Sequence, residues 1–331
     1  MMTTSAKALR GPLDLIVIAG VTGTGKTALS LAIAERYAAE GQAVEILNGD
    51  AMQFYRGMDI GTAKLSLQDR SRFPHHLFDF LDVQQNATVA DFQERARDTI
   101  LEIQQRGAIP VLVGGSGLYL SAVLQDFAFP PRDENLRTEF ELESERPGGA
   151  ERLVKRLNEL DPEAAAQINH GNIRRIIRAL EVVTLTGRPY ASTLPENSPH
   201  WSPATQIFLD GDREVLRQRL LLRVQEMFHS GLLAEVEELL EAGLERGSTA
   251  LRAIGYQQAI NVLRGLSTED EAIHETWQLT TRYARRQRSW FNRYTDIARF
   301  DYADPELLSS VMSLLQVHKN TDSLTDQAEA R

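Results

Sequence analysis

Short apolar runs alternate with segments of helical periodicity in the first part of the chain. Residues 15–19 (Leu-Ile-Val-Ile-Ala) are rich in β-branched side chains and precede a glycine-rich turn, which predicts a strand buried on both faces. Apolar positions then recur at helical spacing until Gly41, which ends the predicted helix. Residues 44–47 and 110–113 are further apolar runs, and residues 90–106 place their apolar side chains on one helical face. This alternation predicts a parallel sheet covered by helices.

The pattern changes near residues 129–132, Phe-Pro-Pro-Arg. From there to about Pro203 the chain is polar, helical in character and interrupted by Pro and Gly, with no apolar strand run. We therefore expect an inserted all-helical domain at 130–203, and a long excursion from a single domain is the alternative. Residues 207–209 restore the strand pattern.

Helical segments are expected from Arg213 to about Leu240 and from Thr268 to about Tyr294, followed by an amphipathic stretch at 307–317. The expected fold class is α/β: a P-loop-type parallel sheet flanked by helices, with an inserted all-helical domain. The expected parts of the chain are a sheet domain of 13–129 and 204–315, the helical insertion of 130–203 and a flexible tail of 316–331.

The composition narrows the class of protein. Hydrophobic residues make up 42% and charged residues 25% of 331, which is enough to bury a core and excludes wholesale disorder. No apolar run approaches the roughly 20 residues of a membrane span, and the first residues lack the apolar core of a secretory signal. The absence of cysteine excludes disulfides, cysteine zinc sites and thiol nucleophiles. We therefore expect a cytoplasmic protein.

The formal net charge is −10, from 36 basic and 46 acidic residues. A negative total disfavours indiscriminate binding to polyanions, but it leaves room for a local basic surface.

A phosphate-binding loop is the strongest chemical signal in the sequence. It matches G-x-x-x-x-G-K-[ST] between a predicted strand and a predicted helix, and its residues are Gly20, Val21, Thr22, Gly23, Thr24, Gly25, Lys26 and Thr27. Backbone N–H groups of such a loop and the N-terminus of the helix cradle phosphates, the lysine reaches the outer phosphates, and the threonine hydroxyl can hold Mg²⁺. The motif predicts binding of a di- or triphosphate, ATP among them, without establishing hydrolysis.

A standard ATPase also has an apolar strand that ends in a metal-holding aspartate, and the sequence matches this second motif only weakly. The strand of 110–113 ends in Gly114-Gly115, and only Asp210, after the short run of 207–209, fits the pattern. Asp50 follows the second predicted strand and reaches the same sheet edge as the phosphate loop, where a carboxylate could accept a proton from a nucleophile. A turn or helix-capping role for Asp50 is the alternative.

Several further blocks occur in a fixed order. They are Asp50-Ala51-Met52-Gln53 with the string Gly-Met-Asp-Ile-Gly-Thr-Ala-Lys at 57–64, Phe-Pro-His-His at 73–76, Val-Gly-Gly-Ser-Gly-Leu-Tyr at 113–119, Arg-Ala-Leu-Glu-Val at 178–182, Ala-Ile-Gly-Tyr at 253–256 and Arg-Arg-Gln at 285–287. Together with the phosphate loop, they resemble the bacterial tRNA dimethylallyltransferases (tRNA isopentenyltransferases) over roughly residues 13–300. The string at 57–64 is the most specific of these blocks.

The resemblance implies transfer of a dimethylallyl group from dimethylallyl diphosphate to N6 of the adenosine 3′-adjacent to the anticodon of tRNA. It implies that residues 20–27 hold the diphosphate, with Mg²⁺ bound through Thr27. Asp50 would be the general base, Thr22 would contact the bridging oxygen of the leaving diphosphate, and Arg223 would contact the diphosphate. These three are the expected catalytic residues.

The resemblance also implies a tRNA-contacting surface. Arginines and aromatic side chains interleave between Arg282 and Arg299, a pattern that suits RNA contact. An amphipathic helix with core aromatics and solvated arginines is the alternative. The target base must leave its stack to reach the carboxylate. The expected tRNA-binding residues are Asp50, Ala51, Met52, Gln53, Ser116, Arg137, Arg174, Arg175, Ile176, Ile177, Arg178, Arg252, Gly255, Tyr256, Gln257, Arg285, Arg286, Gln287 and Arg288.

Three other functions compete with this one. A prenyltransferase acting on free adenine nucleotides would not need a long basic track. A small-molecule kinase would bind ATP in the loop and would need a site for the phosphoryl acceptor. Asp50 is the one residue that points to such a site. A non-catalytic RNA-binding protein would not need an intact phosphate loop beside Asp50. By family analogy, the protein is expected to be a monomer with no membrane partner.

Overall fold

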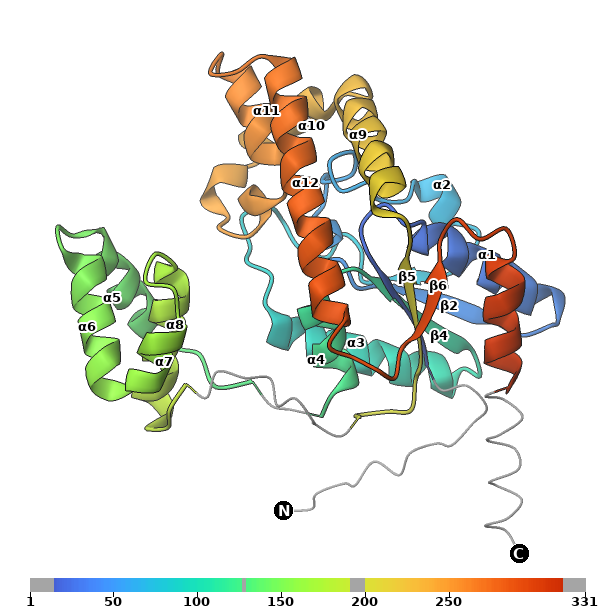
Figure 1. Cartoon of the computed structure of the whole chain (residues 1–331), viewed down its shortest axis with the longest axis horizontal. Helices are drawn as coiled ribbons and strands as arrows, with labels where there is room; N and C mark the ends of the chain where they lie inside the picture. The colour runs from blue at the N-terminus through green and yellow to red at the C-terminus, as the bar shows by residue number, and fades with distance from the viewer. Residues whose placement is uncertain (1–14, 127–128, 191–199, 318–331) are drawn as a thin grey trace, which may run out of the picture. The chain divides into compact units, whose positions relative to one another are not determined.

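The computed structural model describes residues 15–126, 129–190 and 200–317 (Figure 1). The chain divides into two compact units. One unit comprises the chain up to Gln125 and from His200 onward, and the other is Asp126–Pro199. The sequence analysis places the insertion at 130–203, about four residues further along the chain at either end.

Six parallel strands form the sheet of the first unit, in the order β3-β2-β4-β1-β5-β6. The central strand β1 pairs with β4 on one side and β5 on the other, so that Ile18 lies opposite both Val113 and Ile207. The edge strands β3 and β6 are short and carry no apolar run, which is why the sequence pattern did not predict them. The strands are β1 (Ile16–Gly20), β2 (Val44–Asn48), β3 (His75–His76), β4 (Ile109–Gly114), β5 (Thr205–Asp210) and β6 (Ala298–Asp301).

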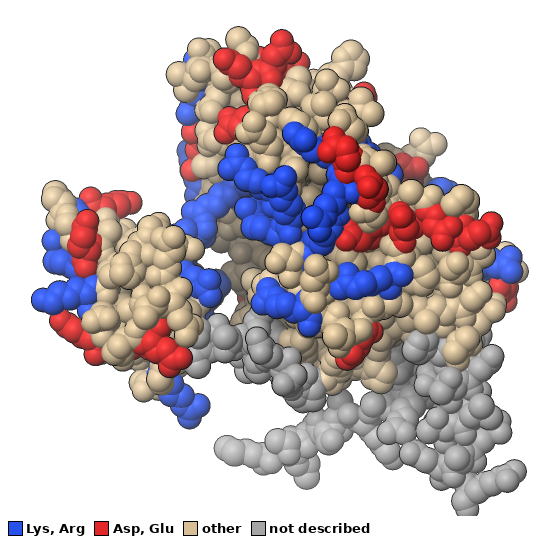
Figure 2. Space-filling view, in the orientation of Figure 1, with Lys and Arg blue, Asp and Glu red and all other residues tan. Residues whose placement is uncertain are grey.

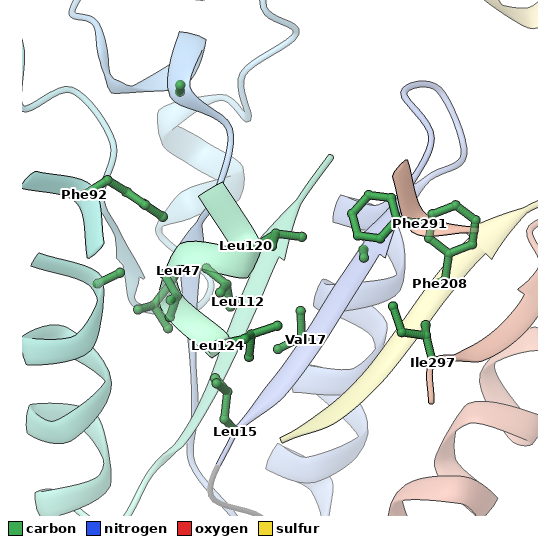
Figure 3. Close-up of a cluster of buried hydrophobic side chains, with 14 of the residues drawn as sticks. Leu15, Val17, Leu47, Phe92, Leu112, Leu120, Leu124, Phe208, Phe291 and Ile297 are labelled. Carbon is green, nitrogen blue, oxygen red and sulfur yellow. The ribbon is translucent and has the colours of Figure 1, made fainter. Parts of the chain in front are cut away.

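Alternate residues of β1 serve two cores, because successive side chains of a strand point to opposite faces. Val17, together with Leu15 just before the strand, packs with side chains from α3 (Val89–Gln105), α4 (Gly117–Leu124) and α12 (Glu269–Phe291), as Figure 3 shows. Ile16 and Ile18 pack instead with α1 (Lys26–Ala39) and the helix of residues 307–317. The sheet is therefore covered by helices on both faces, as the α/β prediction requires.

A group of helices with its own apolar cluster follows β5. The expected helical segment from Arg213 to Leu240 is broken at Gly231, which has a φ of +102°, a backbone conformation that favours glycine. The helices of this group that precede α12 are α9 (Arg213–His229), α10 (Leu232–Glu241) and α11 (Tyr256–Leu263), together with the 3₁₀ turns Leu244–Arg246 and Ala250–Arg252. Their cluster extends to Tyr55 and Met58, so it also anchors the segment that follows β2.

The second unit contains four described helices around one core. They are α5 (Glu134–Glu145), α6 (Gly149–Leu160), α7 (Pro162–Gln167) and α8 (Ile173–Thr186). Glu181 is fully buried in this unit. Its carboxylate accepts from the Arg178 guanidinium at 2.7 Å and from the Asp133 N–H at 3.0 Å, so the buried charge is paired.

The end of the chain is only partly described. In the helix of 307–317, Val311 and Leu315 are fully buried against the sheet. Most of the flexible tail predicted at 316–331 lies outside the described residues. Across the described ranges, no helix combines the length and apolar character needed to cross a membrane.

Two adjacent residues of α3 test this packing. Ile100 is fully buried, whereas Leu101 is 41% exposed. We expect Ile100→Ala to lower the free energy of unfolding by about 2–5 kcal/mol, because it removes buried methyl groups and leaves a cavity. Leu101→Ala should change it by about 0.5 kcal/mol or less. Urea unfolding followed by circular dichroism measures both, and equal effects would contradict the assigned faces of α3.

Candidate active site

The phosphate loop joins the end of β1 to the start of α1. Gly23 and Gly25 have φ values of +85° and +81°, which favour glycine. A side chain at Gly20 would approach the Leu209 carbonyl oxygen to 2.8 Å. Gly25 caps α1 without a side-chain hydrogen bond, and the first turn of the helix carries no acidic residue. The first-turn N–H groups and the helix dipole therefore favour an anion at this end of α1.

Lys26 supplies a positive charge at the loop. Its Nζ donates to the Val21 carbonyl oxygen at 2.9 Å. Burial lowers the pKa of the Lys26 amine to about 8; the Asp50 carboxylate opposes this shift and the Arg223 guanidinium adds to it. A desolvated ammonium group is stabilised by an anion bound beside it. The loop is therefore electrostatically prepared for a phosphate ligand.

Asp50 is fixed at the carboxyl end of β2. Its N–H donates to Asn48 Oδ1 at 2.9 Å, and its own Oδ1 accepts from the Met52 N–H at 3.0 Å, which caps the 3₁₀ turn Ala51–Phe54. Its second carboxylate oxygen has no hydrogen-bond partner among the described residues. Asp50 thus both caps a turn and presents a free oxygen, so the two interpretations of this residue are compatible.

Two arginines approach from α9. Arg219 and Arg223 are one helical turn apart, and both line the same cavity as the loop. Burial lowers the pKa of Arg223; Asp50 opposes this and Arg219 adds to it. Within the described ranges, the Arg223 guanidinium has no hydrogen-bond or ion-pair partner. Its charge is available to a ligand.

These groups meet in one cavity of about 670 Å³ in the first unit. Its wall includes the phosphate loop, Asp50, Gln53, the segment of 62–66 and the two arginines of α9. A cavity of this size suits a small substrate held by a few convergent polar groups. Its basic side chains face the loop, and a carboxylate lies within their electrostatic range.

The segment of 57–64 forms part of the cavity wall, and its backbone is hydrogen-bonded to a side chain of α10. The Glu235 carboxylate accepts from the N–H groups of Asp59, Ile60 and Gly61 at 3.0, 2.6 and 3.2 Å. Tyr256 Oη donates to Glu235 at 2.6 Å, and a side chain at Gly61 would approach the Tyr256 ring to 2.5 Å. Sequence reasoning missed Glu235, because nothing separates it from the other acidic residues of α10.

Gln287 links α12 to the loop. Its Oε1 accepts from the Thr22 N–H at 2.8 Å, and its Nε2 donates to the Gly115 carbonyl oxygen at 2.8 Å. The side chain is 5% exposed. Tyr283, which hydrogen-bonds to Gln287, lies close enough to Asp50 for the carboxylate to add to the rise in pKa that burial gives the phenol. Gln287 therefore positions the loop from within the protein.

The predicted tRNA-binding residues differ in how accessible the structure makes them. Several of those side chains are buried and cannot meet a large ligand directly: Ala51, Ile176, Ile177, Tyr256, Gln287 and Arg288, together with Gly255. Ile176 and Ile177 belong to the core of the second unit. Arg288 makes a paired contact with Asp210 at 2.5 and 2.7 Å. Asp210, the aspartate that fitted the ATPase pattern, is therefore paired with Arg288.

The other predicted tRNA-binding residues are accessible to different degrees. The exposed ones are Arg174, Arg175, Arg252, Gln257, Arg285 and Arg286. Met52, Gln53, Ser116, Arg137 and Arg178 are half-buried. Gln53 donates to the Thr62 carbonyl oxygen at 3.1 Å, whereas Arg137 and Arg178 lie 3.8 and 2.7 Å from the Glu181 carboxylate.

Thr27 is the candidate metal residue. Its side chain is exposed and lines the cavity in the first turn of α1. No cluster of three His, Asp or Glu side chains suited to a metal occurs in the part of the chain that the structure describes. His75 and His76 instead contact the Phe73 carbonyl oxygen and the Glu45 carboxylate. A single donor, the Thr27 hydroxyl, fits Mg²⁺, because this ion commonly keeps several waters and binds through one or two protein groups plus phosphate oxygens.

Comparison with known proteins places these features in one family. A family model described as IPP transferase matches residues 53–294. The tRNA dimethylallyltransferase of Clavibacter sepedonicus is 53% identical over 301 residues, which cover 91% of this chain and 97% of that protein. The enzyme of the same name from Paenarthrobacter aurescens is 47% identical over 304 residues, covering 92% and 96%.

Solved structures agree with the sequence comparisons. The tRNA isopentenylpyrophosphate transferase of Bacillus halodurans has a TM-score of 0.69 and 35% identity, covering 96% of this chain and all of that one. A eukaryotic dimethylallyltransferase acting on tRNA has a TM-score of 0.75 and 27% identity, covering 94% of this chain and 79% of that one. The chain therefore belongs to the IPP transferase family, the family of the tRNA dimethylallyltransferases.

Proposed function

We propose that the protein transfers the dimethylallyl group of dimethylallyl diphosphate to N6 of the adenosine 3′-adjacent to the anticodon of tRNA. The products are N6-dimethylallyladenosine and diphosphate. The observation that carries this proposal is a single cavity in which a phosphate loop, two arginines of α9 and the carboxylate of Asp50 converge. The names of its relatives support the same reaction.

The diphosphate is the leaving group. As the N6–carbon bond forms, the bond between the allylic carbon and the diphosphate oxygen breaks, and its electron pair stays on that oxygen. Lys26, Arg223 and the first-turn N–H groups of α1 surround the place where this negative charge develops. Thr22 is part of the same loop and of the cavity wall, and its hydroxyl is proposed to contact the bridging oxygen.

Asp50 is proposed as the general base. An exocyclic adenine amine is a weak nucleophile because its lone pair is delocalised into the ring. The free oxygen of Asp50 can accept the N6 proton as the bond to carbon forms. The hydrogen bond from the Met52 N–H holds the carboxylate in place while it does so.

Magnesium is proposed as the cofactor, held by the Thr27 hydroxyl and by oxygens of the diphosphate. When bound, it would neutralise negative charge on the leaving group. The residues of the chain itself bind and orient the two substrates.

Structural details bear on the alternatives. The pairing of Asp210 with Arg288 removes the acid that a standard ATPase would use for its metal. The exposed arginines of α12, Arg282, Arg285 and Arg286, favour a polyanionic acceptor over a mononucleotide. We propose that the protein acts as a monomer in the cytoplasm, where tRNA is modified.

A transfer assay tests the function. Purified protein is incubated with Mg²⁺, dimethylallyl diphosphate and either AMP or an unmodified anticodon stem-loop bearing adenosine 3′ of the anticodon. Mass spectrometry should show the gain of one dimethylallyl group on the stem-loop alone. A gain on AMP alone would make the protein a nucleotide prenyltransferase. No gain on either acceptor, together with ATP turnover in a parallel incubation that contains ATP, would make it a kinase or ATPase.

Asp50→Asn in the same assay tests the proposed base. The amide keeps the size of the side chain and an oxygen for the Met52 N–H, but it cannot accept the proton. We expect kcat to fall by about 10²- to 10⁴-fold. Asp69→Asn removes a charge from the same cavity wall and should leave kcat within about threefold. Equal losses would assign the effect to charge alone.

The pKa of Lys26 gives a pH prediction. The amine, with a pKa of about 8, is partly neutral at pH 8.5, and a bound diphosphate raises that pKa because it favours the charged form. Binding of dimethylallyl diphosphate at pH 8.5 should therefore take up protons, and affinity should fall as the pH rises above 8. Calorimetry in buffers of different ionisation enthalpy measures the uptake, which Lys26→Met should abolish. Unchanged uptake in this variant would contradict the assignment.

Gln287→Met tests the positioning of the loop. The variant loses both hydrogen bonds, to the Thr22 N–H and to the Gly115 carbonyl oxygen. We expect kcat/KM for dimethylallyl diphosphate to fall about 10- to 100-fold, because the loop is no longer held in register with the leaving group. The affinity for stem-loop RNA should change less than about threefold. The control Gln225→Met alters an exposed glutamine of α9, and a loss of similar size there would contradict the positioning role.

A further inference from the structure

A second, smaller hollow lies outside the active-site cavity, where α9 and α12 pack together. Its volume is about 160 Å³. We call it the α9–α12 groove; it is lined by Arg217, Trp277, Gln278, Thr281, Arg282 and Arg285. None of these residues lines the active-site cavity, so the groove is a separate site.

The groove carries positive charge that the protein itself does not neutralise. Arg217, Arg282 and Arg285 are all exposed. Arg282 and Arg285 have no ion-pair or hydrogen-bond partner in the described ranges, and the carboxylate nearest to Arg217, that of Glu214, is 3.9 Å away and exposed. Figure 2 shows Lys and Arg side chains gathered along α12 and the neighbouring α9. Three arginines around one hollow favour an anionic ligand.

Trp277 orients one of these arginines. The Arg217 guanidinium lies 4.5 Å from the centre of the Trp277 ring, and Trp277 Nε1 donates to the Arg217 carbonyl oxygen at 3.0 Å. The ring also packs against the apolar clusters of the first unit. Because arginine covers one side of the ring and the core another, Trp277 is not free to stack on a base. The groove is therefore suited to a phosphate group.

Thr281 adds an unused polar group. Its Oγ1 is buried and lacks a hydrogen-bond partner among the described residues. Buried hydroxyls are nearly always hydrogen-bonded, so a partner is expected in the groove itself. An oxygen of an anion held by the arginines can accept that hydrogen bond.

We propose that the α9–α12 groove binds a backbone phosphodiester of the RNA substrate. This inference rests on the proposed function, because it takes tRNA as the ligand. Arg217 is two residues from Arg219, about 200° around the helix axis, so α9 directs one arginine to the groove and another to the active-site cavity. One helix thus binds the phosphates of both substrates, on different flanks.

The double variant Arg217→Gln/Arg282→Gln tests the site in the full-length protein. Fluorescence anisotropy with the anticodon stem-loop should show about tenfold weaker binding in 0.1 M salt, as expected for loss of a charged hydrogen-bonded contact. The slope of log K against log salt concentration should fall by about 0.7 to 1 for one lost phosphate contact. Calorimetry with inorganic diphosphate and Mg²⁺ should give an unchanged affinity, which shows that the active-site cavity is intact.

Two single variants sharpen the result. Arg36→Gln removes an exposed arginine from the far end of α1 and should leave both the affinity for the stem-loop and its salt slope unchanged. Thr281→Val keeps the shape of the side chain, removes the hydroxyl and should weaken stem-loop binding severalfold. An effect of the double variant no larger than that of Arg36→Gln overturns the proposed site.

The two proposals can fail separately. If the wild-type protein binds and prenylates the stem-loop but the groove variants behave like wild type, the groove proposal is wrong and the function stands. If the wild-type protein does not bind the stem-loop, the proposed function is wrong and the groove proposal falls with it.

Discussion

The active site is organised around positive charge that is partly withdrawn from water, on the half-buried side chains of Lys26 and Arg223. The Arg223 guanidinium lowers the pKa of the Lys26 amine, and the Arg219 guanidinium lowers the pKa of Arg223, so neighbouring positive charges disfavour one another here. Asp50 offsets only part of that cost. The uncapped N-terminus of α1 adds partial positive charge at the same place. A bound anion would offset the rest of that cost, because it favours the charged forms of Lys26 and Arg223.

The geometry around this charge is set from distant parts of the chain. Gln287 lies 265 positions from Thr22, yet its side chain holds the N–H of that residue. Glu235 holds the backbone of the segment of 57–64 through three hydrogen bonds and is itself held by Tyr256. Helices α10, α11 and α12 therefore support from behind a site whose phosphate loop and Asp50 lie in the first 65 residues, while α9 adds Arg219 and Arg223 to its wall. This explains why residues with no access to a ligand occur in the blocks that identify the family.

The sequence predicted what depends on local pattern. The phosphate loop, the buried central strands and Asp50 at a strand end follow from periodicity and from the known geometry of parallel sheets. The edge strands β3 and β6 were not predicted, because two to four half-exposed residues carry no such signal. The role of Glu235 is tertiary and has no local signature.

Neighbouring residues that the sequence analysis treated alike differ in burial. Arg285 and Arg286 are exposed, whereas Gln287 and Arg288 are buried, and one contiguous block had assigned all four to RNA. The helical spacing of Ala284, Gln287, Arg288 and Phe291 marks the inner face of α12, and that signal was available in the sequence. Ile176 and Ile177 lie on the apolar face of α8, so their predicted contact with tRNA cannot involve an exposed side chain in this structure.

The strand order also governs how the protein can be made. The central strand β1 pairs with β5, and β5 pairs with β6, so the sheet closes only after residues 298–301 have left the ribosome. The helices of 134–186 are local in sequence and have their own core, so they can fold while the rest of the chain is still being synthesised. Until then, β5 has an unpaired edge, and the sheet face that Val311 and Leu315 cover is exposed. Translation pauses before residue 298 would therefore extend the period in which the nascent chain is vulnerable to aggregation and dependent on chaperones.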